Sequence, residues 1–394
     1  MEPLIRELTD ADREANHRLG AEAFGYAPDG QPSSLPPVGG AVLGAFVGDE
    51  LTAKIRARDD EIPLPGSRTL AMFGVEGVAV APEARGRGLL SPLFRAGFDR
   101  ARRVGQPISI LFPTAAGIYR RFGYEVVGSL EQREIPMSAL AKIKAPERIS
   151  LRRASAADLD AIRLLYAAWA AERLGPLTRI RPSAPILSAD YLGSPAAVTL
   201  AIDQSGKLVG SVRWTRGTGY DPETSVIEVE DLIGLTPDAS RAMWRFLGTF
   251  DSVSSRVNVE LPSGDESLTA LPAEPAPPAK EHRYMLALLD IPAALAARRG
   301  VPGLTAQLPF KVTGGFADGV DGQYVLKAAS GELHCSRTDS GVGPTFHARG
   351  IAALYGGAQR CAGLRAGGML NGPTDTDPVW DSLFNVPTHV RDYF

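Results

Sequence analysis

Cysteine, histidine and long apolar runs are scarce in this chain of 394 residues. The two cysteines, Cys335 and Cys361, are too few for a disulfide framework and are typical of a reducing compartment, so we expect a cytoplasmic protein. The longest apolar run, residues 164–171, is far shorter than the roughly 20 residues that span a bilayer. The N-terminal residues contain no apolar signal core, and the five histidines lack the spacing of metal ligands. We therefore expect no membrane segment and no bound metal.

A surplus of charge is also missing. The chain has 42 Lys and Arg against 45 Asp and Glu, which leaves no basic excess for a nucleic-acid partner. Apolar residues make up 44% and charged residues 22%, the proportions of a soluble globular protein. At about 150 residues per domain, the length predicts two or three domains.

The first 150 residues have the pattern of a mixed α/β unit. An amphipathic helix is expected over residues 11–24, followed by a Gly/Pro/Ser loop at 25–40. Apolar strands are expected at 41–47 and 70–80, with a charged connection between them that contains proline. A helix beginning near Leu90 and a strand at 108–112 complete the unit.

A second unit begins near residue 150. Its helix, residues 157–173, has Ser155 as a cap candidate with Asp158 three residues later. Strands are expected at 198–202, 208–214 and 226–235. Residues 76–99 and 230–251 form a faint internal repeat of strand, Pro-acid-Ala loop and helix, and the second copy is three residues shorter at the loop. If that loop carries the chemistry, the second unit is a copy that has lost it.

The third segment starts near Arg283, after a Pro/Ala/Ser-rich stretch at 261–280 that we expect to be an exposed loop. Residues 324–328 and 332–336 read as a strand pair, and 351–355 and 358–364 as short helices. The last ten residues are largely apolar, so we expect the C-terminus to be docked against the protein.

The strongest local signal is the run from Val78 to Leu90, in which a strand enters an Arg-Gly-Arg-Gly loop and the loop opens a helix. Glycines that adopt positive φ let consecutive N–H groups converge, and the helix N-terminus adds partial positive charge, which together form a pyrophosphate cradle. A plain surface turn and a nicotinamide dinucleotide site are alternatives, but the third glycine of the dinucleotide pattern is Ser91 here. A Walker loop is excluded, because no matching motif occurs.

The Arg-Gly-x-Gly form after a strand resembles the acyl-CoA loop of the GNAT N-acetyltransferases. Downstream, residues 117–124 (Gly-Ile-Tyr-Arg-Arg-Phe-Gly-Tyr) resemble a segment of the enhanced intracellular survival (Eis) family of these enzymes, as do residues 283–295 and the terminal Phe394. The resemblance implies α/β mixed sheets in two tandem GNAT-like domains, residues 1–149 and a degenerate 150–284. It also implies a sterol-carrier-protein-like domain, 285–394, that delivers the C-terminus.

The resemblance further implies acetyl-CoA as co-substrate. Carried onto this sequence, the cofactor-binding residues are Val78, Ala79, Val80, Arg85, Gly86, Arg87, Gly88, Leu89, Leu90, Ser91, Thr114 and Ala115. The family's general acid corresponds to Tyr119 and its general base to the C-terminal carboxylate of Phe394, with Glu76 as the alternative base. Backbone amides near Val80 are expected to hold the thioester oxygen.

The family acetylates amines of aminoglycosides, often at several positions, which confers antibiotic resistance, and some members acetylate lysines of peptides. The first domain lacks Trp, so aromatic walls of the substrate pocket are expected from Phe24, Tyr26, Phe46 and Phe73 or from the second unit. Glu76 and Asp392 are further substrate-binding candidates, while Glu228, Glu230 and Asp231 line either a cationic pocket or a solvated strand edge. Relatives form hexamers, so we expect a homohexamer. Two alternatives stay open, a lipid-binding or scaffold protein and a nicotinamide oxidoreductase.

Overall fold

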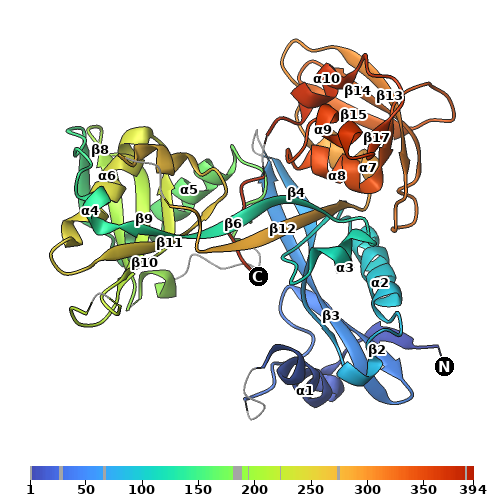
Figure 1. Cartoon of the computed structure of the whole chain (residues 1–394), viewed down its shortest axis with the longest axis horizontal. Helices are drawn as coiled ribbons and strands as arrows, with labels where there is room; N and C mark the ends of the chain where they lie inside the picture. Colours follow the sequence, from blue (N-terminus) through green and yellow to red (C-terminus); the bar gives the residue numbers. More distant parts are fainter. Residues whose placement is uncertain are drawn as a thin grey trace.

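The computed structural model describes residues 2–25, 30–64, 68–180, 189–193, 195–221, 223–272, 276–386 and 388–394. The substrate candidate Tyr26 lies outside the described residues. Three lobes meet at the middle of the molecule, and the C-terminus lies between them (Figure 1). No helix in these described ranges is long and apolar enough to cross a membrane.

A 12-stranded sheet runs through two of the lobes in the order β1-β2-β3-β4-β5-β12-β6-β11-β10-β9-β8-β7. Its first half contains β1 (Leu4–Glu7), β2 (Gly40–Val47), β3 (Glu50–Leu64), β4 (Arg68–Val80), β5 (Ile108–Leu111) and β6 (Glu125–Pro136). The helices of this part are α1 (Arg13–Phe24), α2 (Leu90–Arg103) and α3 (Ala116–Arg120), whereas α4 (Met137–Leu140), which follows β6, packs in the core of the other lobe (Figure 1).

The second half of the sheet forms the other lobe. Its strands are β7 (Ile149–Arg153), β8 (Ala197–Asp203), β9 (Leu208–Arg216), β10 (Ile227–Gly234) and β11 (Arg256–Pro262), with helices α5 (Leu159–Ala170) and α6 (Pro237–Leu247). The predicted cap is confirmed, because Ser155 donates from its backbone N–H to the Asp158 carboxylate at 2.8 Å. The strand–loop–helix repeat is also present, as β4 followed by α2 and β10 followed by α6.

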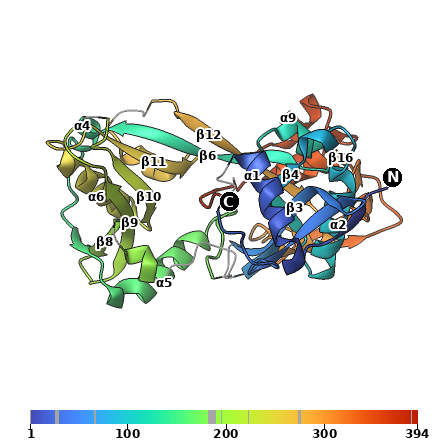
Figure 2. The ribbon, with the colours of Figure 1, turned by 90° about the horizontal axis from the view of Figure 1, so that it is seen from below.

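Two long strands join the halves. β6 pairs with β11 of the second unit from Leu130 to Pro136, and β12 (Lys280–Leu288) pairs with β6 on one side and with β5 on the other. Both strands reach from one lobe into the other (Figure 2). β12 crosses the predicted boundary at residue 284, and its last residues, including Met285 opposite Leu111, belong to the sheet of the first unit. The domain boundaries themselves stay predictions.

The third lobe has a five-stranded sheet, β15-β14-β13-β16-β17. Its elements are α7 (Ile291–Ala297), β13 (Ala306–Thr313), β14 (Gly322–Ala329), β15 (Glu332–Arg337), β16 (Thr345–His347), α8 (Ala348–Tyr355), α9 (Cys361–Ala366), β17 (Leu370–Asn371) and α10 (Asp377–Leu383). Phe310, Tyr324, Phe346 and Trp380 fill its interior and are each at most 3% exposed. This packed core argues against the large apolar cavity that a lipid carrier needs.

One expectation was wrong. Most of the charged connection expected between the first two apolar strands is β3, a strand of 15 residues. Apolar and charged residues are interspersed along it, and Lys54, Arg58 and Asp60 are buried with partners: Lys54 donates to Asn16 of α1, and Arg58 pairs with Asp60 and Glu76. Charges that are paired inside a protein look, in the sequence, like charges in water.

Candidate active site

β4 stops pairing with β5 shortly before the predicted cofactor segment begins, while it stays paired with β3. Its parallel pairing with β5 ends at Val75 opposite Leu111. On the β3 side a bulge follows, since Glu76 faces Arg56 while Ala79 faces Lys54. Gly77 sits in this bulge with φ +58°, a left-handed conformation that favours glycine. The two parallel strands therefore diverge, and the β4 backbone from Gly77 to Val80 borders the opening.

The loop after β4 has the geometry of an anion cradle. A short 3₁₀ turn, Pro82–Ala84, leads to Gly86 and Gly88, with φ +77° and +76°, and α2 then begins at Leu90. The N-cap of α2 is Leu89, which has no side-chain oxygen, so the first N–H groups of the helix receive no side-chain cap. Free N–H groups at a helix N-terminus bind phosphate readily.

A cavity of about 740 Å³ lies between this loop, the end of α1 and α3. Most of the predicted cofactor residues line it, together with Phe24 and Tyr119. The predicted residues in its wall are Val78, Ala79, Val80, Arg85, Gly86, Gly88, Leu89, Leu90 and Thr114. Arg87 and Ser91 are outside this wall, and Ala115 lines a neighbouring cavity. Ala23, Ala84, Gly117, Ile118 and Arg121 also line the cavity and were not predicted as cofactor residues. The small and aliphatic side chains carry no chemical signal in a sequence, and Arg121 was noted only as part of the segment that resembles the Eis family.

Tyr119 on α3 is buried, 6% exposed, in the wall of this cavity. Its ring packs edge-to-face on Phe94 of α2 at a centroid distance of 6.0 Å. Burial raises the pKa of Tyr119 above its ordinary value of 10. The phenol therefore stays protonated at neutral pH and can donate a proton.

The C-terminus approaches this region through Phe112, which directly follows β5. The Phe394 ring lies 5.5 Å from the Phe112 ring, and Tyr393 lies 4.7 Å from it. A second cavity, of about 510 Å³, is lined by Phe112, Thr114 and Tyr393 among others. Because Thr114 lines both cavities, Tyr393 lies in the wall of a cavity that adjoins the cofactor opening.

The Phe394 ring and Glu76, the alternative base, also meet at one guanidinium. Arg58 Nη1 donates to Glu76 Oε2 at 2.9 Å, and its guanidinium lies 4.4 Å from the centre of the Phe394 ring. The other Glu76 oxygen pairs with Arg56 at 2.6 Å. Each carboxylate oxygen of Glu76 is thus engaged by an arginine.

Two predicted aromatic walls were wrong. Phe73 is fully buried in the core against Phe98, and Phe46 is packed in the cluster beneath α1 with the Arg6 guanidinium over its ring. Both side chains are on strands whose alternation directs them inward. Phe24, 50% exposed, is the predicted aromatic residue that does line the cavity.

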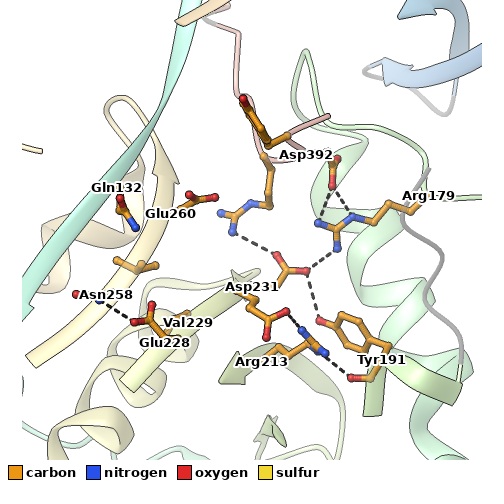
Figure 3. A pocket seen from close by; sticks show the side chains of 14 residues that line it. Gln132, Arg179, Tyr191, Arg213, Glu228, Val229, Asp231, Asn258, Glu260 and Asp392 are labelled. Carbon is orange, nitrogen blue, oxygen red and sulfur yellow. Dashed lines mark hydrogen bonds and ion pairs between the residues drawn. The ribbon is translucent and has the colours of Figure 1, made fainter. Parts of the chain in front are cut away.

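A third cavity, of about 410 Å³, lies in the second unit (Figure 3). Five carboxylates and three guanidinium groups line it: Glu228, Glu230, Asp231, Glu260 and Asp392, with Arg179, Arg213 and Arg391. Tyr393 lines both this cavity and the one beside Phe112. Of the two readings of residues 228–231, the structure favours a pocket over a solvated edge.

Asp392 is buried and its oxygens have partners. Oδ1 accepts from Arg179 at 2.8 Å, and Oδ2 accepts from the backbone N–H of Leu177 at 2.9 Å. The same arginine donates through Nη1 to Asp231 Oδ2 at 2.5 Å. Burial alone raises the pKa of a carboxyl, but Arg179 and Arg391 hold the pKa of Asp231 below its ordinary value. Asp392 is thus committed to protein contacts.

Comparison with known proteins agrees with this geometry. Models of the acetyltransferase (GNAT) domain match residues 4–127 and residues 189–289. The chain is 29% identical to an uncharacterized N-acetyltransferase of Streptomyces coelicolor, covering 79% of this chain and 78% of the relative. It is 27% identical to the N-acetyltransferase Eis of Mycobacterium tuberculosis, covering 86% and 84%.

Solved structures share the whole fold. A GCN5-related N-acetyltransferase from Kribbella flavida is 29% identical, with a TM-score of 0.81 over 100% of this chain and 99% of that one. Eis1 from Mycobacterium abscessus has the same fold at 22% identity, with a TM-score of 0.77 over the full length of both chains.

Proposed function

We propose that this chain, a GNAT-type N-acetyltransferase similar to Eis over most of its length, acetylates amines of polycationic small molecules such as aminoglycosides. In this proposal Tyr119 is the general acid and the C-terminal carboxylate of Phe394 is the general base. The observation that supports it is the contact of the Phe394 ring with Phe112 and with Arg58, whose partner Glu76 lies just before the predicted cofactor segment of β4.

The co-substrate of this enzyme class is acetyl-CoA, and the residues of the first unit fit it. The uncapped start of α2 and the left-handed Gly86 and Gly88 suit a pyrophosphate, and Arg85 adds positive charge at the cavity wall. The diverging β4 backbone offers N–H and C=O groups to the pantetheine amides. Acetyl-CoA supplies an activated thioester that a neutral amine can attack.

Tyr119 and Phe394 divide the two proton transfers in this proposal. A terminal carboxylate is ionised at neutral pH and accepts the proton that the incoming ammonium must lose. The Tyr119 phenol, whose pKa is raised by burial, keeps its proton for the departing thiolate. Glu76 is the weaker candidate base, because Arg56 and Arg58 already occupy its two oxygens.

A cationic acceptor is supported by the chain of cavities. Thr114 joins the cofactor cavity to the one beside Phe112, and Tyr393 joins the latter to the cavity of the second unit. That last cavity has more carboxylates than guanidinium groups, so its field favours positive charge. The three cavities follow one another through shared lining residues, and in this proposal an amine-rich molecule approaches the thioester along them.

Lysine side chains of a peptide are the second candidate acceptor, since the same acids would attract them. A cytoplasmic homohexamer is part of the proposal on the strength of the family resemblance, and light scattering after size exclusion tests the assembly. Both cysteines of the chain are free, as a reducing compartment requires.

The test measures thiol release from acetyl-CoA with aminoglycosides, simple polyamines and lysine peptides. Three chains are compared: the intact one, one lacking Phe394, and one with a single glycine appended after Phe394. The appended residue keeps the Phe394 ring and moves the carboxylate by about 3.8 Å. Turnover that both altered chains lose supports the terminal base. Full turnover by the extended chain contradicts the terminal base. Turnover of peptides without turnover of aminoglycosides would make peptide lysines, not aminoglycosides, the substrate class.

A further inference from the structure

The second unit has the same strand opening as the first. The parallel pairing of β10 with β11 ends at Val229 opposite Val259, just as that of β4 with β5 ends at Val75 opposite Leu111. A bulge follows in each case, between Val229 and Asp231 on β10. The copy therefore retains the divergent strands that border the cofactor cavity in the first unit.

The N-terminus of α6, however, does not offer an anion site like that of α2. The loop between β10 and α6 lacks the two left-handed glycines, and Thr236 caps the helix by accepting from the Ala239 N–H at 3.1 Å. One of the N–H groups that would face a phosphate is thereby occupied. This opening has no cradle.

The C-terminal tail, residues 388–394, lies against this opening instead, and Arg391, Asp392 and Tyr393 line the cavity of about 410 Å³ beside it. Arg391 joins its two sides, because Nη1 lies 3.4 Å from Asp231 on β10 and Nη2 lies 3.2 Å from Asp265, just after β11. His389 Nε2 lies 3.4 Å from the same Asp265 oxygen. Asp265, Glu266 and His389 bring their ligand atoms within 4.8 Å of one another, but Arg391 and Arg173 already pair with the two carboxylates. This cluster is a grip on the tail.

Arg179 holds the tail from the other side. It donates to Asp392 at 2.8 Å and to Asp231 at 2.5 Å, so it links the tail to β10. Its φ of +55° is a left-handed backbone conformation, which a residue other than glycine keeps only where surrounding contacts hold it. The network consists of five charged side chains, those of Arg179, Arg391, Asp231, Asp265 and Asp392. Each of them is at most 8% exposed.

Close backbone contacts complete the grip. The Thr388 N–H donates to Gly356 O at 3.0 Å, and the His389 N–H donates to Leu174 O at 2.6 Å. A Cβ on Gly175 would lie 2.9 Å from the Thr388 side chain, and one on Gly128 would lie 3.2 Å from the Thr388 carbonyl. All three lobes thus contribute contacts to the tail.

We infer that the second unit has exchanged cofactor binding for holding the C-terminal tail, and that Arg179, Asp231, Asp265, Arg391 and Asp392 are positioning residues for Phe394. The inference rests on the proposed role of Phe394. Asp392 lies two residues before the terminus and is fixed by Arg179, so its anchor determines how far the terminal carboxylate can reach. A misplacement of about 1 Å at a reacting group can cost up to 100-fold in rate.

The test is Asp392→Asn in two backgrounds, the intact chain and a chain lacking Phe394. This substitution keeps the shape of the side chain and removes its charge. In the intact chain we expect kcat to fall between about 10- and 100-fold, with the KM for acetyl-CoA unchanged. In the chain lacking Phe394 the same substitution should change the residual rate less than twofold. Asp238→Asn, which disrupts an exposed pair with Arg241 on α6, is the matched control and should change neither rate.

Amide hydrogen exchange of the peptide covering residues 388–394 gives a second readout, and Asp392→Asn should accelerate it selectively. Equal rate losses in both backgrounds would show a merely structural role and overturn the inference. No loss in the intact chain, where deletion of Phe394 abolishes turnover, also overturns it. If deletion of Phe394 leaves turnover intact, the proposed base fails instead. Amide hydrogen exchange of residues 388–394 then tests whether the network holds the tail, and exchange that Asp392→Asn leaves unchanged overturns that role.

Discussion

The guanidinium of Arg58 lies 4.4 Å from the centre of the Phe394 ring, although the two residues are at opposite ends of the chain. Arg58 is on β3, and the same side chain pairs with Asp60 and Glu76. A cation over an aromatic face is attracted by the ring quadrupole. This contact ties the C-terminus to the strand pair that borders the cofactor opening.

Arg58→Lys should weaken that contact without removing the charge, because an ammonium neither stacks on a ring nor binds two carboxylates as a planar fork. We expect kcat to fall about tenfold, which corresponds to about 1.4 kcal/mol. Steady-state kinetics measure the effect. Arg95→Lys, at an exposed cation–π contact with Phe316 in the third lobe, should leave kcat within twofold.

Tyr119→Phe removes the proposed acid and keeps the ring that packs on Phe94. General acid catalysis contributes about 10²–10⁴-fold, so kcat should fall by at least 100-fold with little change in acetyl-CoA affinity. Rapid quench of the first turnover separates this effect from product release. A loss below twofold would remove Tyr119 from the mechanism.

The pH profile offers an independent check on Tyr119. Because burial raises its pKa above 10, the acid form persists through the neutral range and is lost only as the pH rises past that raised value. The plot of kcat against pH should therefore show no alkaline fall that belongs to Tyr119 below pH 10. A fall near neutrality that Tyr119→Phe abolishes would contradict the assignment.

Gly88→Ala should impair acetyl-CoA binding through the backbone. No atom lies within 4 Å of the added Cβ, so the cost comes from φ +76°, about 1 kcal/mol. We expect the KM for acetyl-CoA to rise about fivefold. Gly206→Ala, with φ +83° in an open turn of the second unit, carries the same strain far from the cavity and should leave that KM unchanged.

Acid should release the tail in two stages. Burial lowers the pKa of His389 below its ordinary 6.5, against the opposing hydrogen bond with Asp265, so the released state binds the proton more tightly. The contribution of neutral His389 to the stability of the docked tail is complete above pH 6.5. It is lost as the pH falls below that value. The second stage belongs to Asp231 and Asp265, whose pKa values Arg391 and their other partners lower despite burial, so that their contribution begins to fall near pH 3.8 and is lost as the pH falls further.

Hydrogen exchange of residues 388–394 as a function of pH, corrected for its intrinsic rate, measures both stages. His389→Gln should abolish the stage that begins near pH 6.5 and leave the acidic one. A single transition near pH 4 in the intact chain would show that His389 takes no part.

Much of the first unit could be predicted because its signals are local. The apolar alternation of β4, the glycines of the loop and the helical spacing after Leu90 each act within a few residues, and Gly86 and Gly88 have the positive φ that the cradle requires. The repeat in the second unit was visible for the same reason. β3 was missed because Lys54 and Arg58 read as solvated charges until Asn16 and Glu76 are placed beside them.

What the sequence determined by itself was the strand–loop–helix run of the first unit, its faint copy in the second, and the resemblance that predicts an acetyl-CoA loop and Tyr119 as the acid, since these depend on neighbouring residues. Tertiary structure alone decided that Asp392 pairs with Arg179 and that the tail lies against the opening of the second unit. It also decided that Phe394 lies against Arg58 and that the three cavities share lining residues. These contacts join residues more than 150 positions apart. The free-energy cost of burying a charge is offset only when its partner is buried beside it, and no local sequence pattern shows which residues will be partners.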